Sequence, residues 1–282
     1  MEIHNSGLSK SPVNGIGSTV APSVASRRQP RRSKEDLRSL LLEAAQEILR
    51  EQGLGVGTDA LSFKRVFDRV ERDTGLRLTN ASVIRRIWDN QADYHTDVLV
   101  DIAADDGRED VDRTINALGP VLGSIDLSTP TGRFAAMSEI CRVGGAANIK
   151  ALRESHNWSL WIGVWALATA GESTDQKKRI QLALLEGYES VTELYEETYL
   201  ALLGLLGLRI RPPLTIRHFT VAVGALAEGC TLRNRVDLDM EGIDLPTGPD
   251  GDDQEWTVFG IGLEALARRF LELDPDWTPR PG

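Results

Sequence analysis

The longest stretch with helical periodicity, residues 176–206, limits the possible folds more than any other part of this sequence. Its apolar and aromatic positions recur every three or four residues: Ile180, Leu184, Leu185, Tyr188, Val191, Leu194, Tyr195, Thr198 and Leu202. This spacing puts them on one side of a helix. Pro212 and Pro213 then break the chain, because proline cannot continue a helix.

Most of the remaining chain has the same periodicity, and we find neither a convincing strand nor an internal repeat. The sequence therefore predicts an all-α fold. Further helices are expected at 34–53, 62–75, 79–88, 91–104, 109–122, 131–143, 146–170, 215–232 and 254–273. Gly144 and Gly145 are expected to end one of them. The acidic, Gly- and Pro-containing stretch 237–253 is expected to be a mobile loop.

Composition narrows the class of protein. The two cysteines, Cys141 and Cys230, suggest neither a disulfide framework nor a metal cluster, which fits a reducing cytoplasm. The first residues lack a signal-peptide pattern, and the longest uncharged run, 158–171, is too short to span a bilayer. We expect a soluble cytoplasmic protein without a cofactor, since no phosphate-binding glycine loop, metal-ligand spacing or nucleophile elbow is present.

The segment Thr79–Trp88 has the residue pattern of a DNA recognition helix. At helical spacing, Val83, Ile84, Ile87 and Trp88 share one side, while Ser82, Arg85 and Arg86 share the other. An apolar back with arginines in front suits contact with phosphates or guanine edges. The alternative is an ordinary solvated helix face.

Charge is distributed unevenly along the chain. Residues 27–100 carry a net charge of +2, whereas residues 101–282 carry −12. Residues 1–32 lack periodicity, are expected to be disordered, and end in Arg27, Arg28, Arg31 and Arg32. Such an arm can reach DNA phosphates or the minor groove, or it can simply be a solubilising tail.

Two motifs in the N-terminal third resemble the TetR/AcrR (tetracycline-repressor-like) family of transcriptional regulators. Residues 41–53 match that family's opening helix, LLxAAxxLLxExG. Trp88 occupies the place of the aromatic residue that ends the third helix, followed by a polar turn and a fourth helix. The resemblance implies three parts: an arm at 1–32, a helix-turn-helix domain at 33–90, and a helical ligand-binding and dimerisation domain at 91–282.

The resemblance also implies DNA contacts from Thr79, Asn80, Ser82, Arg85 and Arg86. Two positions depart from the family pattern. Arg85 stands where the family usually has a phosphate-contacting Tyr, and Gln91 stands where it has a Lys at the start of the fourth helix. Because arginine binds phosphate well, Arg85 and Arg86 can replace these contacts. The alternative is a DNA site that has been weakened or lost.

A tryptophan stripe is the best candidate for a ligand pocket. Trp158, Trp161 and Trp165 are spaced three and four residues apart, and pockets are commonly walled by aromatic rings with a few polar groups. Polar candidates are Arg142, His156, Asn157, Tyr188 and Tyr195; Arg153 lies nearby. We expect an apolar or aromatic effector, although a plain core helix would show the same stripe.

The last two helices alternate large and small residues, which allows close helix packing. Phe219, Val223 and Leu226, with Phe259, Leu263, Leu266 and Phe270, are expected to form a four-helix bundle with a second copy of the chain. The family dimerises in this way. The alternative is packing within one chain.

The expected function is a homodimeric transcriptional regulator, most often a repressor in this family, that an effector releases from double-stranded DNA. One alternative is an all-helical sensor or interaction protein that has lost DNA binding. A helical enzyme is the third reading, although the four scattered histidines suggest no catalytic group.

Overall fold

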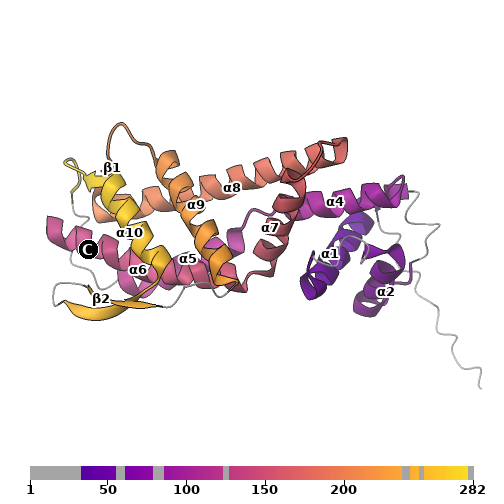
Figure 1. Cartoon of the computed structure of the whole chain (residues 1–282), viewed down its shortest axis with the longest axis horizontal. Coiled ribbons are helices and arrows are strands. Elements are labelled where there is room, and N and C mark those ends of the chain that lie inside the picture. The colour runs from indigo at the N-terminus through magenta and orange to yellow at the C-terminus, as the bar shows by residue number, and fades with distance from the viewer. Residues whose placement is uncertain are drawn as a thin grey trace, which may run out of the picture. The chain divides into compact units, whose positions relative to one another are not determined.

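A computed structural model describes residues 33–54, 61–78, 86–122, 127–236, 242–247 and 251–278, and most of them are helical (Figure 1). The helices are α1 (Lys34–Gln52), α2 (Phe63–Thr74), α4 (Gln91–Ala103), α5 (Arg108–Leu122), α6 (Pro130–Glu154), α7 (His156–Thr169), α8 (Asp175–Leu206), α9 (Ile216–Asn234) and α10 (Val258–Phe270). The strands are β1 (Leu208–Ile210), β2 (Ile243–Thr247), β3 (Asp252–Trp256) and β4 (Leu271–Leu273). Within these ranges, no helix combines the length and apolar character needed to cross a membrane.

The first two helices follow from their apolar stripes. In α1, Leu41, Ala45 and Leu49 are buried, and Gly53 follows with a φ of 74°. In α2, the buried residues Phe63, Val66, Phe67 and Val70 share one face, and Gly75 ends the helix in a left-handed conformation that glycine adopts without a Cβ clash. The two predicted helices are confirmed, as are those at 91–104, 109–122, 176–206 and 215–232 within two residues at each end.

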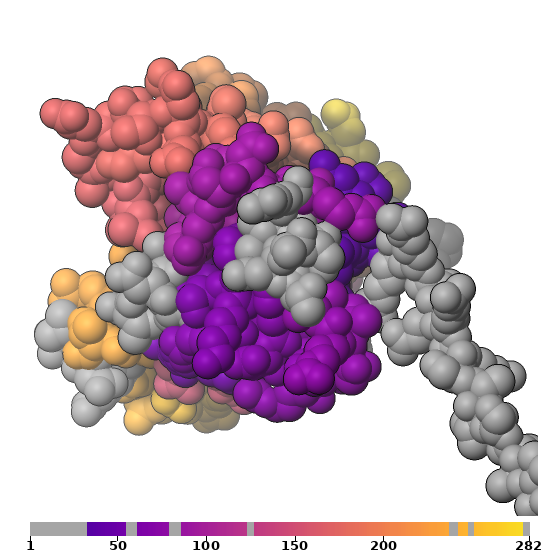
Figure 2. All heavy atoms as spheres, turned by 90° about the vertical axis from the view of Figure 1, so that its right-hand side faces the viewer, coloured from indigo at the N-terminus to yellow at the C-terminus, as the bar shows by residue number. Residues whose placement is uncertain are grey.

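One hydrophobic cluster joins α1, α2 and α4 to α7 and to the first half of α8. Tyr94 of α4 lies at its centre, fully buried, with its ring 4.8 Å from the rings of both Phe63 and Trp88. Figure 2 shows the face that α1, α2 and α4 form, with the beginning of α8 beside them. The predicted domain boundary at residue 90 therefore falls between two contacting rings, and residues 34–282 form one compact unit.

A second cluster joins α6, the end of α8, α9 and α10. Two small antiparallel sheets border it: β1 pairs with β4, and β2 pairs with β3 with Ile243 opposite Trp256. Trp256 is buried and donates from its indole nitrogen to Thr247, 2.7 Å away. The expectation of no strands was therefore wrong, and so was that of a mobile loop over 243–247 and 252–253.

The glycine pair Gly144–Gly145 does not end a helix, contrary to the prediction. α6 runs through both residues, and the two glycines instead allow other elements to approach the helix closely. A Cβ on Gly145 would lie 2.8 Å from the Cα of Gly260 in α10, so only glycine allows this contact. The break comes at Ser155, whose side chain caps α7 at Trp158. The last helix is also shorter than predicted, because β3 and β4 occupy its two expected ends.

Candidate functional site

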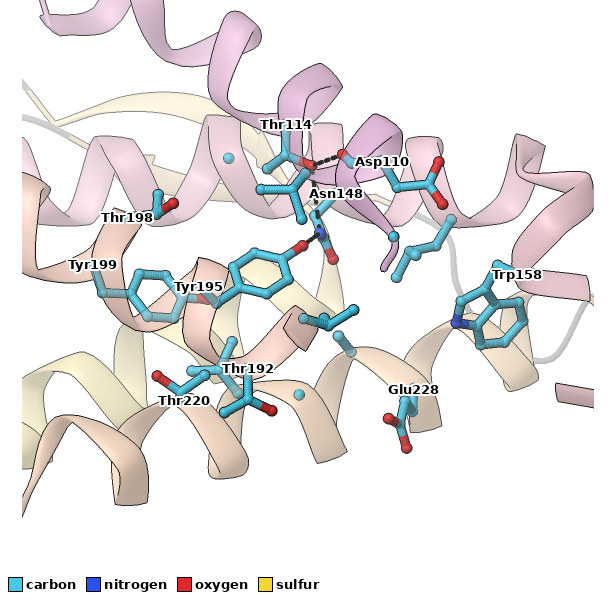
Figure 3. Close-up of a pocket in the computed structure, with 18 of the residues that line it drawn as sticks. Asp110, Thr114, Asn148, Trp158, Thr192, Tyr195, Thr198, Tyr199, Thr220 and Glu228 are labelled. Atoms are coloured by element: carbon cyan, nitrogen blue, oxygen red, sulfur yellow. Dashed lines mark hydrogen bonds between the residues drawn. The ribbon is translucent and has the colours of Figure 1, made fainter. Parts of the chain in front are cut away.

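A cavity of about 350 Å³ lies among α5, α6, α7, α8, α9 and α10 (Figure 3). Aliphatic and aromatic side chains make up most of its wall, among them Val111, Leu118, Val223, Phe259 and Leu263. Its volume and apolar character are those of a small-molecule site.

A polar group spans the α5, α6 and α8 walls of this cavity. The side-chain amide of Asn148 donates to the Tyr195 hydroxyl at 2.9 Å and to the Thr114 hydroxyl at 3.4 Å (Figure 3). Thr114 in turn donates to the Asp110 backbone carbonyl at 2.9 Å. Burial raises the pKa of Tyr195 to about 12, so this hydroxyl keeps its proton at neutral pH.

A second polar pair joins α8 to α9. The Tyr188 hydroxyl donates to the Glu228 carboxylate at 3.1 Å, and the Trp161 ring meets the Tyr188 ring edge-on at 4.8 Å. Burial raises the pKa of Glu228, and the hydrogen bond from Tyr188 offsets only part of that rise. All three residues line the cavity, so two aromatic rings and a carboxyl group lie together on this wall.

Three buried polar atoms on the cavity wall have no hydrogen-bond partner within the described chain: Asp110 Oδ1, Asn148 Oδ1 and Thr220 Oγ1. Their residues are each more than nine-tenths buried. An unsatisfied buried polar atom costs about 1–3 kcal/mol, so three such atoms around one cavity need an explanation. A bound molecule with matching groups would supply one.

Five of the eight predicted ligand-binding residues line this cavity, and three do not. Those that do are Asn157, Trp158, Trp161, Tyr188 and Tyr195. Trp165 is 42% exposed, because it lies two helical turns, roughly 10 Å, beyond Trp158 along α7. Arg142 instead pairs with Glu139, and His156 lines a polar hollow beside α1 that adjoins the cavity and shares Asp105, Asp110 and Asn157 with it.

The sequence prediction missed Asp110, Thr114, Asn148, Thr220 and Glu228. The sequence pattern that could have revealed them is a polar residue at a position that continues the apolar face of a helix. Asn148, for example, lies one and two turns after the buried Gly144 and Cys141 on α6. Such a residue marks either a satisfied core contact or a cavity wall, and periodicity alone does not distinguish them.

Most of the predicted DNA-binding residues fall outside the described ranges: Thr79, Asn80, Ser82, Arg85, Arg27, Arg28, Arg31 and Arg32. The described remainder of that segment is Arg86 and Ile87, both helical, followed by Trp88. Arg86 and Gln91 are exposed, whereas Trp88 is buried. Asn90 caps α4 by accepting from the Asp93 backbone N–H.

Asp97 of α4 connects Trp88 to two other helices. Its carboxylate accepts the Trp88 indole N–H at 2.8 Å, the Arg38 guanidinium of α1 at 2.9 Å, and the Arg179 guanidinium of α8 at 2.6 Å. Burial by itself raises the pKa of Asp97, but these hydrogen bonds outweigh it and hold the pKa below 3.8. The segment that ends at Trp88 is therefore tied to α1, α4 and α8 through one side chain.

The cavity reaches the other end of α4. Asp105 and Gly107, just after α4, line it together with Gly187 of α8. A Cβ on Gly187 would lie 2.6 Å from the Ala103 carbonyl oxygen, so α8 crosses the end of α4 in direct backbone contact. On the α7 wall, the cavity residue Asn157 accepts from Arg50 of α1 at 2.9 Å.

Three of the seven predicted dimerisation residues are buried within one chain, and the other four are half-buried. Phe219, Val223 and Phe259 are buried in the second hydrophobic cluster, and Leu226, Leu263, Leu266 and Phe270 pack against it. Phe219, Val223 and Phe259 are therefore covered by their own chain and present no surface to a partner. The pattern of large and small residues reflects the packing of α9 against α10, where Leu226 fills the space beside Gly262.

Within the described ranges, no group of three or more His, Cys, Asp or Glu residues is placed to hold a metal ion. No family model matches the chain. No curated protein has a significantly similar sequence.

Proposed function

We propose that this protein is a DNA-binding transcriptional regulator of the TetR/AcrR kind, whose affinity for its operator is changed by a small molecule in the cavity. Two copies of the chain are needed to read a two-fold symmetric operator, with one recognition helix for each half-site. The residues proposed to contact DNA are Thr79, Asn80, Ser82, Arg85, Arg86 and Gln91.

The observation that carries this proposal is the position of α4. Its first residues follow directly after the arginine-containing segment, which Trp88 anchors through Asp97. Its other end adjoins the cavity, which Asp105 and Gly107 line just after the helix. A single thirteen-residue helix thus has the proposed DNA-binding segment at one end and the candidate ligand site at the other.

The proposed mechanism is an equilibrium between two arrangements of α4. A ligand that fills the cavity contacts Gly187 and Tyr188 on α8, where α8 touches the end of α4. If that contact favours a different position of α4, Trp88 and the arginines before it move with the helix. The ligand can weaken DNA binding only to the extent that it binds the two arrangements with different affinity.

Selection of binding sites from a random DNA pool tests the proposal directly. The expected result is enrichment of one two-fold symmetric sequence, whose affinity falls steeply as salt rises because phosphate contacts release counterions. Failure to enrich any sequence at low salt would contradict the proposal. It would favour the alternative of a helical sensor that does not bind DNA.

The Arg86→Ala variant then tests the recognition segment. If Arg86 reads a base, its loss should weaken binding to the selected sequence by about 1–3 kcal/mol and affect random DNA less. The matched control is Arg153→Ala, which removes the same charge from an exposed position on α6. An equal loss on both DNAs would make Arg86 a phosphate contact, and no loss on either would remove it from the interface.

A further inference from the structure

The charged residues of the cavity wall are all acidic. Asp105, Asp110 and Glu228 line it, and no Lys, Arg or His does so among the described residues. Arg113 lies 3.5 Å from Asp110 but makes its closer ion pair with Glu109. Glu228 contacts the Tyr188 hydroxyl, a neutral donor. Beside Glu228, a carboxylate ligand would meet like charge, whereas a cationic ligand would meet opposite charge.

The wall atoms that form no hydrogen bond are mainly acceptors. Because the Thr114 hydroxyl gives its proton to the Asp110 carbonyl, its oxygen can only accept from Asn148. Asn148 must therefore turn its nitrogen toward Thr114 and Tyr195, which leaves its Oδ1 without a donor. Asp110 Oδ1 also accepts no hydrogen bond, and its ion-pair contact with the Arg113 guanidinium is long, at 3.5 Å. A ligand that satisfies these atoms must bring N–H or O–H groups.

The Glu228 wall has the chemistry that stabilises an ammonium group. The Tyr188 hydroxyl holds the carboxylate, and the Trp161 ring packs edge-on against Tyr188. Carboxylates pair with ammonium groups, and aromatic faces attract cations when water is excluded. Glu228 is labelled in Figure 3 on the α9 side of the cavity, across from Asn148 and Tyr195.

We infer that the cavity binds an apolar amine, whose protonated nitrogen pairs with Glu228 and whose apolar body fills the aliphatic wall. A second N–H or O–H of the ligand reaches Asn148 Oδ1. The inference gives the ligand class for the proposed function and rests on the same cavity. Its test uses the protein without DNA, so its outcome is independent of whether the protein binds an operator.

Calorimetric titration with matched probes tests the ligand class. One set shares a naphthalene body and differs in the end group: 2-(1-naphthyl)ethylamine, 2-(1-naphthyl)ethanol and 1-naphthylacetate. Equivalent amine, alcohol and carboxylate sets on phenyl and adamantyl bodies cover smaller and rounder shapes. In the set that fits best, the amine should bind about tenfold or more tightly than the alcohol, and the carboxylate weakest. A carboxylate that binds as tightly as its amine, or no binding by any amine, would overturn the inference.

The Glu228→Gln variant tests the anchor. Glutamine keeps an oxygen that can accept from Tyr188 but removes the charge, so amine affinity should fall about tenfold while alcohol affinity stays the same. The control is Glu193→Gln, which makes the same charge change at an exposed position of α8 outside the cavity. If both variants weaken the amine equally, the preference reflects the net charge of the protein, and Glu228 is not the anchor.

The Asn148→Leu variant tests the second contact with a different readout. It should weaken a diamine or amino alcohol more than a monoamine of the same body, because only the former use Oδ1. An equal effect on both probes would mean that Asn148 acts only through packing, which contradicts its assigned role. Melting temperatures of all variants without ligand identify any that fail to fold.

Discussion

At the scale of single residues, Asp97 is the most heavily bonded carboxylate described in the chain. Three donors from separate segments meet it: the Trp88 indole, Arg38 and Arg179. Its side chain is 12% exposed, whereas the two arginines are 40% and 50% exposed. Water can therefore replace the arginine contacts in part, but it cannot easily reach the indole N–H of buried Trp88.

The Asp97→Asn variant should unfold about 1–3 kcal/mol more easily than the wild type at neutral pH, because the charge-assisted bonds are lost. The exposed Asp112→Asn variant, with the same change of charge, should stay within about 0.5 kcal/mol. Denaturant unfolding measures both. Equal stability of the Asp97→Asn variant and the wild type would show that the bonds contribute nothing net.

The lowered pKa of Asp97 makes the contribution of this residue to folding stability depend on pH. Because the folded-state pKa lies below 3.8, the stabilisation is fully present above that value and is lost as pH falls through the folded-state pKa. Arg38, Arg179 and the neighbouring Asp101 are the charged groups that face it. The difference in stability between the wild type and Asp97→Asn should therefore shrink only below about pH 3.8. A difference that already shrinks near neutral pH would contradict this assignment.

At the scale of secondary-structure elements, the crossing of α4 and α8 depends on a glycine. A Cβ on Gly187 would lie 2.6 Å from the Ala103 carbonyl oxygen, which is a backbone atom. Gly204, further along α8, has no atom within 4 Å of the same position. The two glycines therefore provide a matched pair on one helix.

Gly187→Ala and Gly204→Ala should change stability in opposite directions. The first forces α8 away from α4 and should cost about 1–3 kcal/mol. The second only improves helix propensity and should gain about 0.5–1 kcal/mol. Denaturant unfolding of both variants at one temperature measures the difference. A stabilising Gly187→Ala would show that the two helices do not approach as closely as described.

Periodicity predicted the helices well because one-sided burial leaves a direct trace in the sequence. The strands left none: β3 has the sequence DDQEW, whose acidic residues disfavour a strand, and it forms through pairing with β2. The cavity was predictable only in part for a related reason. Trp158 and Trp161 were found from spacing, but Glu228 and Asn148 line the same cavity through the packing of separate helices, which no local pattern encodes.

At the scale of the whole molecule, the cavity and the segment that ends at Trp88 are joined by more than one route. α8 touches α4 at Gly187, Arg179 of α8 bonds Asp97, and Arg50 of α1 bonds the cavity residue Asn157. The first hydrophobic cluster connects the same helices. These connected helices can transmit a structural change from the cavity to the segment that ends at Trp88 only if they have two discrete arrangements. The ligand and the DNA must favour these arrangements differently.

If the protein binds both partners, their coupling must be reciprocal. A cavity ligand that weakens operator binding by some factor must itself bind more weakly, by the same factor, when operator DNA is present. The Arg50→Gln variant should reduce this factor, because it removes the α1 contact to Asn157 without changing the cavity wall. Its ligand affinity in the absence of DNA should stay within about twofold of the wild type.

Arg69→Gln is the matched control for this last experiment. Arg69 pairs with Glu51 and Asp73, so it joins α2 to α1 without reaching the cavity. Titrating the best-binding amine into each variant, with and without saturating operator DNA, measures the coupling factor directly. A smaller factor in Arg50→Gln alone would identify the α1–α7 contact as a route between the two partners. The same reduction in both variants would instead trace it to a general loosening of α1, and an unchanged factor in Arg50→Gln would leave the crossing of α4 and α8 as the route that matters.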